Sequence, residues 1–88
     1  MYLIYVITDN KNIYIGQTNK PKRRFKDHCN KRVKSTKRFL LYNIFIVEKC
    51  DNRSDALRRE FYYKTAYGRR KIKTLLKENV LEKYRGVV

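Results

Sequence analysis

Two tyrosines, an arginine and a histidine are spaced in this chain so that they could surround one small reactive site. Tyr14 is followed at two residues by Gly16, then by Arg24, and four residues later by His28. A second tyrosine, Tyr5, lies nine residues before Tyr14. Phenols and an imidazole can move a proton, and a guanidinium binds phosphate oxygens. The set therefore suits chemistry on a phosphodiester.

The charge of the chain favours a polyanionic partner. The 88 residues include 23 Lys or Arg against 8 Asp or Glu, so the formal net charge is +15. This excess attracts nucleic acid first and an anionic membrane second. It is densest over residues 20–38, which hold ten Lys or Arg and one Asp. We interpret that stretch as phosphate-binding rather than as a merely solvated surface.

Length and composition predict one globular domain over residues 1–88. A hydrophobic fraction of 42% is typical of a folded chain. No apolar run approaches the ~18 residues of a membrane span, and the amino terminus lacks the basic region of a signal peptide. Cys29 and Cys50 have no metal-ligand spacing, so we expect two reduced thiols. We therefore expect a cytoplasmic protein, associated with the nucleoid, or a nuclear or cytoplasmic one if it is viral.

The elements that must position the reactive residues predict an α+β domain in the order β-β-α-β-α-α. Strands are expected over 2–8, 13–17 and 43–49, and helices over 21–32, 55–67 and 70–78. A loop is expected over 31–38. The three strands would form a mainly antiparallel sheet flanked by the helices. Ser54 is expected to cap the second helix, and Gly68 to end it.

Apolar spacing predicts which residues of the last two helices are buried. In the helix over 55–67 they are Ala56, Leu57, Phe61 and Ala66. In the helix over 70–78 they are Ile72, Leu75 and Leu76.

The first two strands are expected to form a hairpin whose register decides whether the tyrosines meet. If the turn after Thr8 pairs that residue with Ile13, Tyr5 lies opposite Gly16. Directly paired residues share a face of the sheet, as do residues two apart in one strand. Tyr5 and Tyr14 would then lie on one face, whereas a slip of one residue would place them on opposite faces.

The helix that begins at Pro21 would place Arg24 and His28 four residues apart on one face. A lone histidine is more often structural than catalytic, and that interpretation stays open for His28. Glu60 draws attention because acidic residues are scarce in this chain. It could form an intrahelical ion pair with Lys64, or it could bind a divalent cation through oxygen.

Taken together, these residues resemble the motifs of the GIY-YIG nuclease family. The matching positions are Leu3-Ile4-Tyr5, Tyr14-Ile15-Gly16, Thr18, Arg24, His28 and Glu60, in that order. Residues 56–60 and 72–79 also resemble helical motifs of the small stand-alone branch, so the resemblance extends from residue 3 to about residue 80. Leu3 departs from the glycine usual in the first motif. Asn79 is a loose match to an asparagine found near the end of some relatives.

The resemblance implies a metal-dependent DNA endonuclease, a hydrolase of phosphodiester bonds that could be structure-specific or act on single-stranded DNA. The implied catalytic residues are Tyr5, Tyr14, Arg24, His28 and Glu60. Glu60 would hold one divalent cation, Mg²⁺ or Mn²⁺. We prefer Tyr5 as the general base and Tyr14 as the residue that positions phosphate and water, although the resemblance permits either order. The residues expected to bind the substrate are Gly16, Thr18, Lys20, Lys22, Arg23 and Lys26.

A second hypothesis is a nucleic-acid-binding module on the same fold that does not catalyse. Such a binder has no need of Glu60, because a carboxylate near phosphate repels it unless a cation intervenes. A third hypothesis, a basic peptide on a membrane surface, fits poorly because the basic and apolar stretches share no long amphipathic helix. With no separate reading domain expected, specificity would come from the catalytic domain, a protein partner or a homodimer. Strandedness, DNA against RNA, and a role in repair or recombination stay open.

Overall fold

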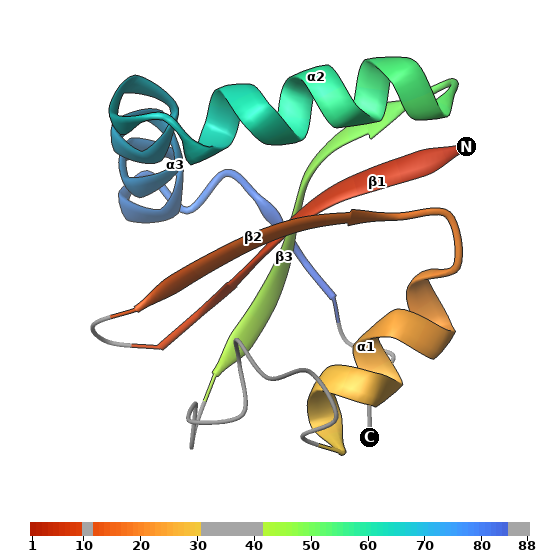
Figure 1. The fold of residues 1–88 in the computed structure, drawn as a ribbon. Helices are drawn as coiled ribbons and strands as arrows, with labels where there is room; N and C mark the ends of the chain where they lie inside the picture. Colours follow the sequence, from red (N-terminus) through yellow and green to blue (C-terminus); the bar gives the residue numbers. More distant parts are fainter. Residues whose placement is uncertain (10–11, 31–41, 85–88) are drawn as a thin grey trace.

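The computed structural model describes residues 1–9, 12–30 and 42–84, and its elements follow the predicted order with one added strand (Figure 1). The elements are β1 (Tyr2–Thr8), β2 (Ile13–Thr18), α1 (Pro21–Cys29), β3 (Asn43–Cys50), α2 (Arg53–Lys64), α3 (Ala66–Lys77) and β4 (Glu82–Lys83). The α+β prediction is therefore confirmed. None of the described helices is both long and apolar enough to cross a membrane.

The sheet of the described residues is antiparallel and has the strand order β2-β1-β3-β4. The predicted hairpin register is confirmed, since Thr8 pairs with Ile13 and Tyr5 with Gly16. The expectation of three strands was incomplete. β4 has only two residues, too few for an alternating pattern, so the sequence contains no signal for it.

The predicted ends of the helices were partly wrong. α2 is capped by Asn52, whose side chain accepts a hydrogen bond from the Asp55 N–H at 2.9 Å, and Ser54 lies inside the helix. α2 ends before Thr65, and the Thr65 side chain caps α3 by accepting from the Gly68 N–H at 3.1 Å. Gly68 therefore lies in the first turn of α3 and does not end α2, because the Thr65 hydroxyl three residues before it caps α3.

α1 is shorter than predicted: it ends at Cys29 and not at residue 32. The Asn30 N–H still bonds to the Lys26 carbonyl, which closes the last turn. The loop expected over 31–38 lies outside the described residues.

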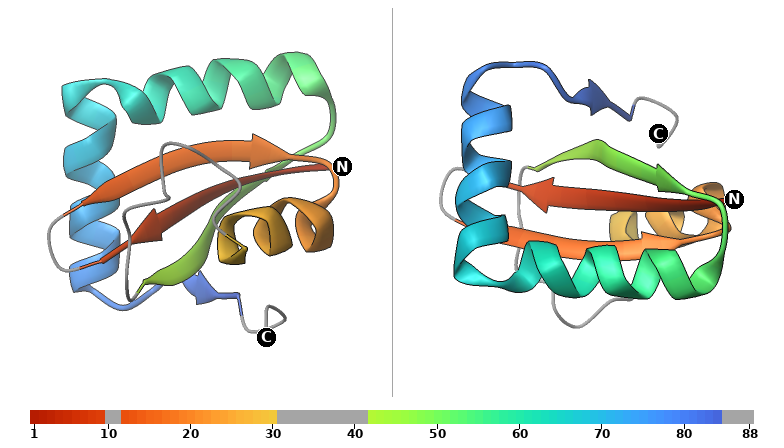
Figure 2. Two further views of the ribbon diagram at one scale, coloured as in Figure 1. Left: turned by 60° about the horizontal axis from the view of Figure 1, so that its bottom comes forward. Right: turned by 90° about the horizontal axis from the view of Figure 1, so that it is seen from above.

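The sheet separates two apolar clusters, and the helices divide between its faces (Figure 2). α2 and α3 cover one face with a cluster made of Ile4, Val6, Ile15, Cys50, Ala56, Tyr63 and Ile72. α1 covers the other face with a cluster made of Tyr5, Ile7, Phe25, Ile44 and Ile46. Alternate residues of β1 thus serve the two faces, as strand geometry requires.

The buried face of α2 differs from the predicted one. Ala56 is fully buried, but Leu57 is 47% exposed and Phe61 is 75% exposed. Ala66 is exposed as well. In α3, Ile72 is fully buried as expected, and Leu75 and Leu76 are half-buried. Tyr63, seven residues after Ala56, packs in this core, where Phe61 was predicted to be buried.

Candidate active site

The side chains of Tyr5, Tyr14, Arg24 and His28 meet on the α1 face of the sheet. The Tyr5 hydroxyl lies 3.0 Å from His28 Nε2 and accepts a hydrogen bond from Arg24 Nε at 3.3 Å. Arg24 also donates through Nη2 to the Tyr14 hydroxyl at 3.4 Å. The rings of Tyr5 and Tyr14 are 6.3 Å apart, and those of Tyr14 and His28 are 5.2 Å apart. One guanidinium therefore joins both phenols, and the predicted hairpin register places the two tyrosines on the same face of the sheet.

Gly16 makes this arrangement sterically possible. A Cβ placed there would lie 2.6 Å from Tyr5 Oη, 2.8 Å from Tyr5 Cζ and 3.2 Å from the Tyr14 ring. The Tyr5 phenol thus lies directly against the β2 backbone, at the residue paired with its own position on β1. Only glycine leaves room for that close approach.

Burial fixes the protonation of the inner pair. Tyr5 is 0% exposed and His28 is 1% exposed. Burial raises the pKa of the Tyr5 hydroxyl above its ordinary value, so it stays protonated at neutral pH. Burial and the neighbouring Arg24 charge lower the pKa of His28 to about 4, so its imidazole is neutral at pH 7. With its oxygen accepting from Arg24, Tyr5 can donate its own proton to His28 Nε2.

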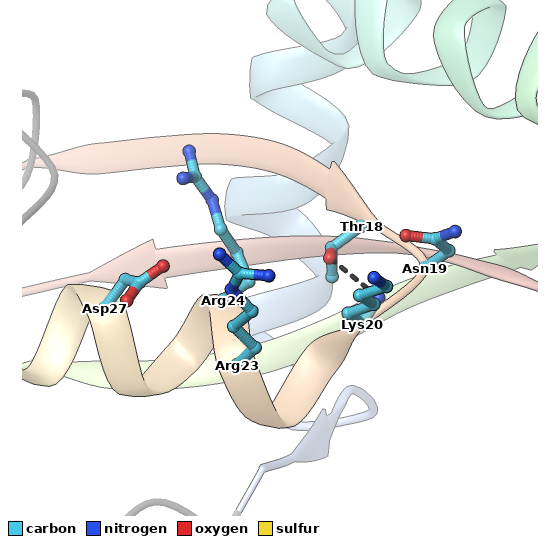
Figure 3. Close-up of a pocket in the computed structure, with 6 residues that line it drawn as sticks. All are labelled: Thr18, Asn19, Lys20, Arg23, Arg24 and Asp27. Carbon is cyan, nitrogen blue, oxygen red and sulfur yellow. Dashed lines mark hydrogen bonds between the residues drawn. The ribbon is translucent and has the colours of Figure 1, made fainter.

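A basic pocket opens beside this cluster, between the end of β2 and the first turns of α1 (Figure 3). Its volume is about 290 Å³. It is lined by Thr18, Asn19, Lys20, Arg23, Arg24 and Asp27. In Figure 3 the Arg24 side chain extends from α1 toward β2. Three cations against one carboxylate suit an anion such as a phosphate group.

Three of the six residues predicted to bind the substrate line this pocket, namely Thr18, Lys20 and Arg23, and Gly16 does not line it. Thr18 is nearly buried, and its Oγ1 accepts from the Lys20 N–H at 3.0 Å, which holds the chain in the turn into α1. Arg23 also lines the pocket, whereas Lys22 and Lys26 are exposed on α1 and do not line it.

Two pocket residues, Asn19 and Asp27, were missed by sequence reasoning. Helical spacing could have found Asp27, which lies three residues after Arg24 and four after Arg23. Phe25 was also missed as a supporting residue. Its ring packs edge-on against Tyr5 at 4.8 Å and holds the phenol in place.

Glu60 comes from α2, on the other face of the sheet. Ala56 and Tyr63 point to the core, and Arg59 turns toward β3, where its Nε bonds to Glu48 at 3.0 and 3.1 Å. Because successive helix residues are about 100° apart, Glu60 projects from a different side of α2 than Arg59 does. Its side chain is only 19% exposed. It belongs to a helix that packs on the face of the sheet opposite the two phenols.

A carboxylate such as that of Glu60 is the kind of ligand that a hard divalent cation prefers. Among the described residues, no group of three or more His, Cys, Asp and Glu could hold a metal. Glu60 is paired with Lys64 at 2.8 Å, which is the ion pair that the spacing allowed. On β2, the buried Oε1 of Gln17 has no hydrogen-bond partner in the described part of the chain. Mg²⁺ often binds through one or two carboxylates and keeps several waters, so the Glu60 carboxylate is a ligand of a fitting kind.

Comparison with known families decides the identity of the fold. A model of the GIY-YIG catalytic domain matches residues 1–73 of the 88. The chain belongs to the GIY-YIG family. No curated protein and no solved structure matches it.

Membership of this nuclease family gives the site a meaning that its geometry alone does not. The tyrosines of the two GIY-YIG motifs are the ones that share the Arg24 guanidinium. The matched range also contains Glu60. The GIY-YIG motifs of this chain are thus a hairpin whose paired strands put one phenol on the glycine of the other motif.

Proposed function

We propose that this GIY-YIG chain is a metal-dependent DNA endonuclease whose active site is the cluster of Tyr5, Tyr14, Arg24 and His28 together with Glu60. The observation that supports this most is the double hydrogen bond of Arg24 to both phenols beside a basic pocket. A binding surface needs exposed cations, but it does not need a cation held between two phenols and a buried imidazole.

Arg24 binds the scissile phosphate in this proposal. Its Nε and Nη2 are held by Tyr5 and Tyr14, so the guanidinium is oriented before substrate arrives, and it lines the pocket. A fixed guanidinium stabilises the negative charge that grows on the phosphoryl oxygens in the transition state. Removing such a donor typically costs about 10²–10³-fold in rate.

We assign the general base to Tyr14, which reverses the order preferred from the sequence. Tyr5 is fully buried, so a water from solvent cannot reach its hydroxyl. Its raised pKa also disfavours the phenolate that a base requires. Tyr14 is only half-buried, so its phenol can lose its proton to solvent, and the Arg24 contact stabilises the resulting phenolate. The phenolate then takes the proton of the attacking water and returns to the neutral phenol. Tyr5 and His28 then act as positioning residues that hold Arg24.

A divalent cation would be held by Glu60, with the Gln17 amide oxygen as a second donor. When bound, it supplies positive charge that stabilises the leaving oxygen and the phosphoryl group. Before that, the Glu60 carboxylate must exchange its ion pair with Lys64 for the cation. The Lys64 side chain is long and already 48% exposed, so it can turn toward solvent and release the carboxylate.

The test is a cleavage assay on labelled single-stranded, duplex and branched DNA with Mg²⁺ or Mn²⁺. Arg24→Ala and Glu60→Gln should each abolish cutting, and Glu60→Gln should leave binding unchanged or stronger because a carboxylate near phosphate is removed. Arg58→Ala and Glu82→Gln are the matched controls, since both side chains are exposed and outside the site. Tight binding without cutting under either metal would favour the non-catalytic module instead. Undiminished cutting by Glu60→Gln would remove the metal-binding role.

The two tyrosines are separated by a second pair of variants. Tyr14→Phe should lower the rate by about 10²–10⁴-fold, the usual contribution of a general base. Tyr5→Phe should cost less, because the ring still packs on Gly16 and only the hold on Arg24 weakens. The opposite order of losses would restore Tyr5 as the base.

A further inference from the structure

The corner between α2 and α3 presents two neighbouring aromatic rings with a cation on each side of the pair, far from the site described above. Arg59 Cζ lies 4.8 Å from the Tyr62 ring centroid, the Tyr62 and Tyr67 rings are 6.1 Å apart, and Arg70 Cζ lies 5.9 Å from the Tyr67 centroid. Tyr67 is 64% exposed, so most of its ring is open to solvent. We call Tyr62, Tyr67, Arg70, Lys71 and Thr74 the corner surface.

This surface is hollowed as well as charged. Tyr67, Arg70, Lys71 and Thr74 line an open pocket of about 370 Å³. α3 contains five Lys or Arg and no Asp or Glu over Ala66–Lys77. Where both partners are described residues, the ion pairs are those of Arg58, Arg59 and Lys64, and no cation of α3 takes part in them. The like charges on this helix repel one another, and an external anion would reduce that repulsion.

Tight packing makes the corner a rigid platform. The Cα of Gly68 packs against the backbone of Tyr62 and Tyr63, so closely that a Cβ could not fit. Thr65 caps α3 directly after α2 ends, which leaves no loop between the helices. The relative position of Tyr62 and Tyr67 is therefore set by backbone contact rather than by mobile side chains.

From these features we propose that the corner surface binds a single-stranded segment of nucleic acid, with a base stacked on Tyr67 and phosphates on Arg70 and Lys71. Stacking on aromatic rings interleaved with cations is the usual way in which proteins hold single strands. A duplex offers less to an exposed ring, because its base faces are already covered by neighbouring pairs and only their edges are open.

The surface lies away from the reactive cluster, so it would extend the contact with substrate. α3 and α1 are on opposite faces of the sheet and at opposite ends of it in all three views (Figures 1 and 2). The inference deepens the proposed function, because it names a single strand as the substrate held outside the cleavage site. Its test, however, requires binding only and not catalysis.

The experiment measures binding of the full chain to fluorescein-labelled dT20 and to a 20-base-pair duplex, by anisotropy in EDTA and at several salt concentrations. Tyr67→Ala should weaken dT20 binding about 10-fold, the equivalent of one lost stacking contact, and change duplex binding less than twofold. Arg70→Gln with Lys71→Gln should weaken dT20 binding and reduce the slope of log affinity against log salt by about 1.4, for two phosphates.

Matched controls separate a site from general charge. Phe61→Ala removes an aromatic ring that is 75% exposed but lies outside the corner surface, and should bind dT20 as the wild type does. Lys49→Gln with Arg58→Gln removes two exposed charges elsewhere, and should change dT20 affinity less than the corner pair does. Tyr67→Leu keeps an apolar contact with Tyr62 and should be as weak as Tyr67→Ala. Melting temperatures equal to that of the wild type show that each variant is folded.

Two results would overturn the inference. One is wild-type dT20 affinity in Tyr67→Ala, and the other is an equal loss from the corner pair and the control pair. Failure of this inference and failure of the proposed function are distinguishable. If the wild-type chain cuts DNA and the corner variants bind dT20 normally, the corner surface alone is refuted. If the corner variants bind dT20 more weakly but the wild-type chain cuts no DNA, the nuclease proposal alone is refuted.

Discussion

Substitution of Gly16 by alanine is the sharpest perturbation of the reactive cluster, because the Tyr5 phenol lies on this residue. A Cβ at position 16 would be 2.6 Å from Tyr5 Oη, whereas ordinary contact begins at 3.4 Å. Either the phenol or the β2 backbone must therefore move by about 0.8 Å to accept the added methyl group.

Neither movement is free of cost. The Tyr5 ring is 0% exposed and packs 4.8 Å from the Phe25 ring, so added volume should cost about 1–3 kcal/mol of unfolding free energy. For a domain of this size, that loss lowers the melting temperature by roughly 4–24 °C. The hydroxyl also moves away from its hydrogen bonds at 3.3 Å to Arg24 and 3.0 Å to His28. A misplacement near 1 Å can cost about 100-fold in rate, and we expect Gly16→Ala to lose that much.

Two assays follow this prediction, thermal melting by circular dichroism and the cleavage rate on the preferred DNA. The double variant Tyr5→Phe with Gly16→Ala is the control, because Tyr5→Phe removes the atom nearest the new methyl group. Gly16→Ala should then destabilise the Tyr5→Phe background less than it destabilises the wild type, which is the mark of direct contact. Additive losses, or wild-type melting and cutting by Gly16→Ala, would refute the contact on which the site is built.

Three further perturbations test the burial, packing and ion pairing of the fold. Because burial and the Arg24 charge lower the pKa of His28 to about 4, the folded chain excludes a proton that the unfolded chain binds below about pH 6.5. As the pH is lowered from about 6.5 to 4, the unfolding free energy should therefore fall by on the order of 3 kcal/mol. Over the same pH range, His28→Gln should lose much less unfolding free energy, and urea unfolding measures both. Gly68→Ala would push a Cβ into the Tyr62 carbonyl and should destabilise the chain by more than about 1–3 kcal/mol in urea, since backbone cannot retract as a side chain can. Glu48→Gln breaks the partly exposed pair with Arg59 and should cost no more than about 1 kcal/mol, an effect that 1 M salt should reduce.

Local patterns predicted the elements that hold the cluster, because the relevant information is local. β-branched and aromatic residues around a short polar turn determine a hairpin, and the turn determines which residues pair. Helical spacing then places Arg24 and His28 on one face without any knowledge of the rest of the fold. The register of Tyr5 against Gly16 and the contacts of Arg24 with both phenols confirm that reasoning.

Other features could not be predicted because they depend on which face of an element meets the sheet. Leu57 and Phe61 are apolar and helical, yet both are exposed, since α2 docks through Ala56 and Tyr63 instead. Gly68 has the residue type of a helix end, but it lies in the first turn of α3, which the Thr65 hydroxyl caps. In each case the sequence allowed two arrangements, and only the tertiary packing decides between them.

By itself, the sequence determined the family and the chemical groups at the site, because motif residues and their spacing are local properties of the chain. The tertiary structure alone decided how those groups differ from one another. Tyr5 is buried with a raised pKa while Tyr14 is half-buried, and Glu60 comes from a helix on the opposite face of the sheet. Both differences arise from burial and from the way the helices pack on the sheet. These depend on contacts between residues far apart in the chain, so no short stretch of sequence predicts them.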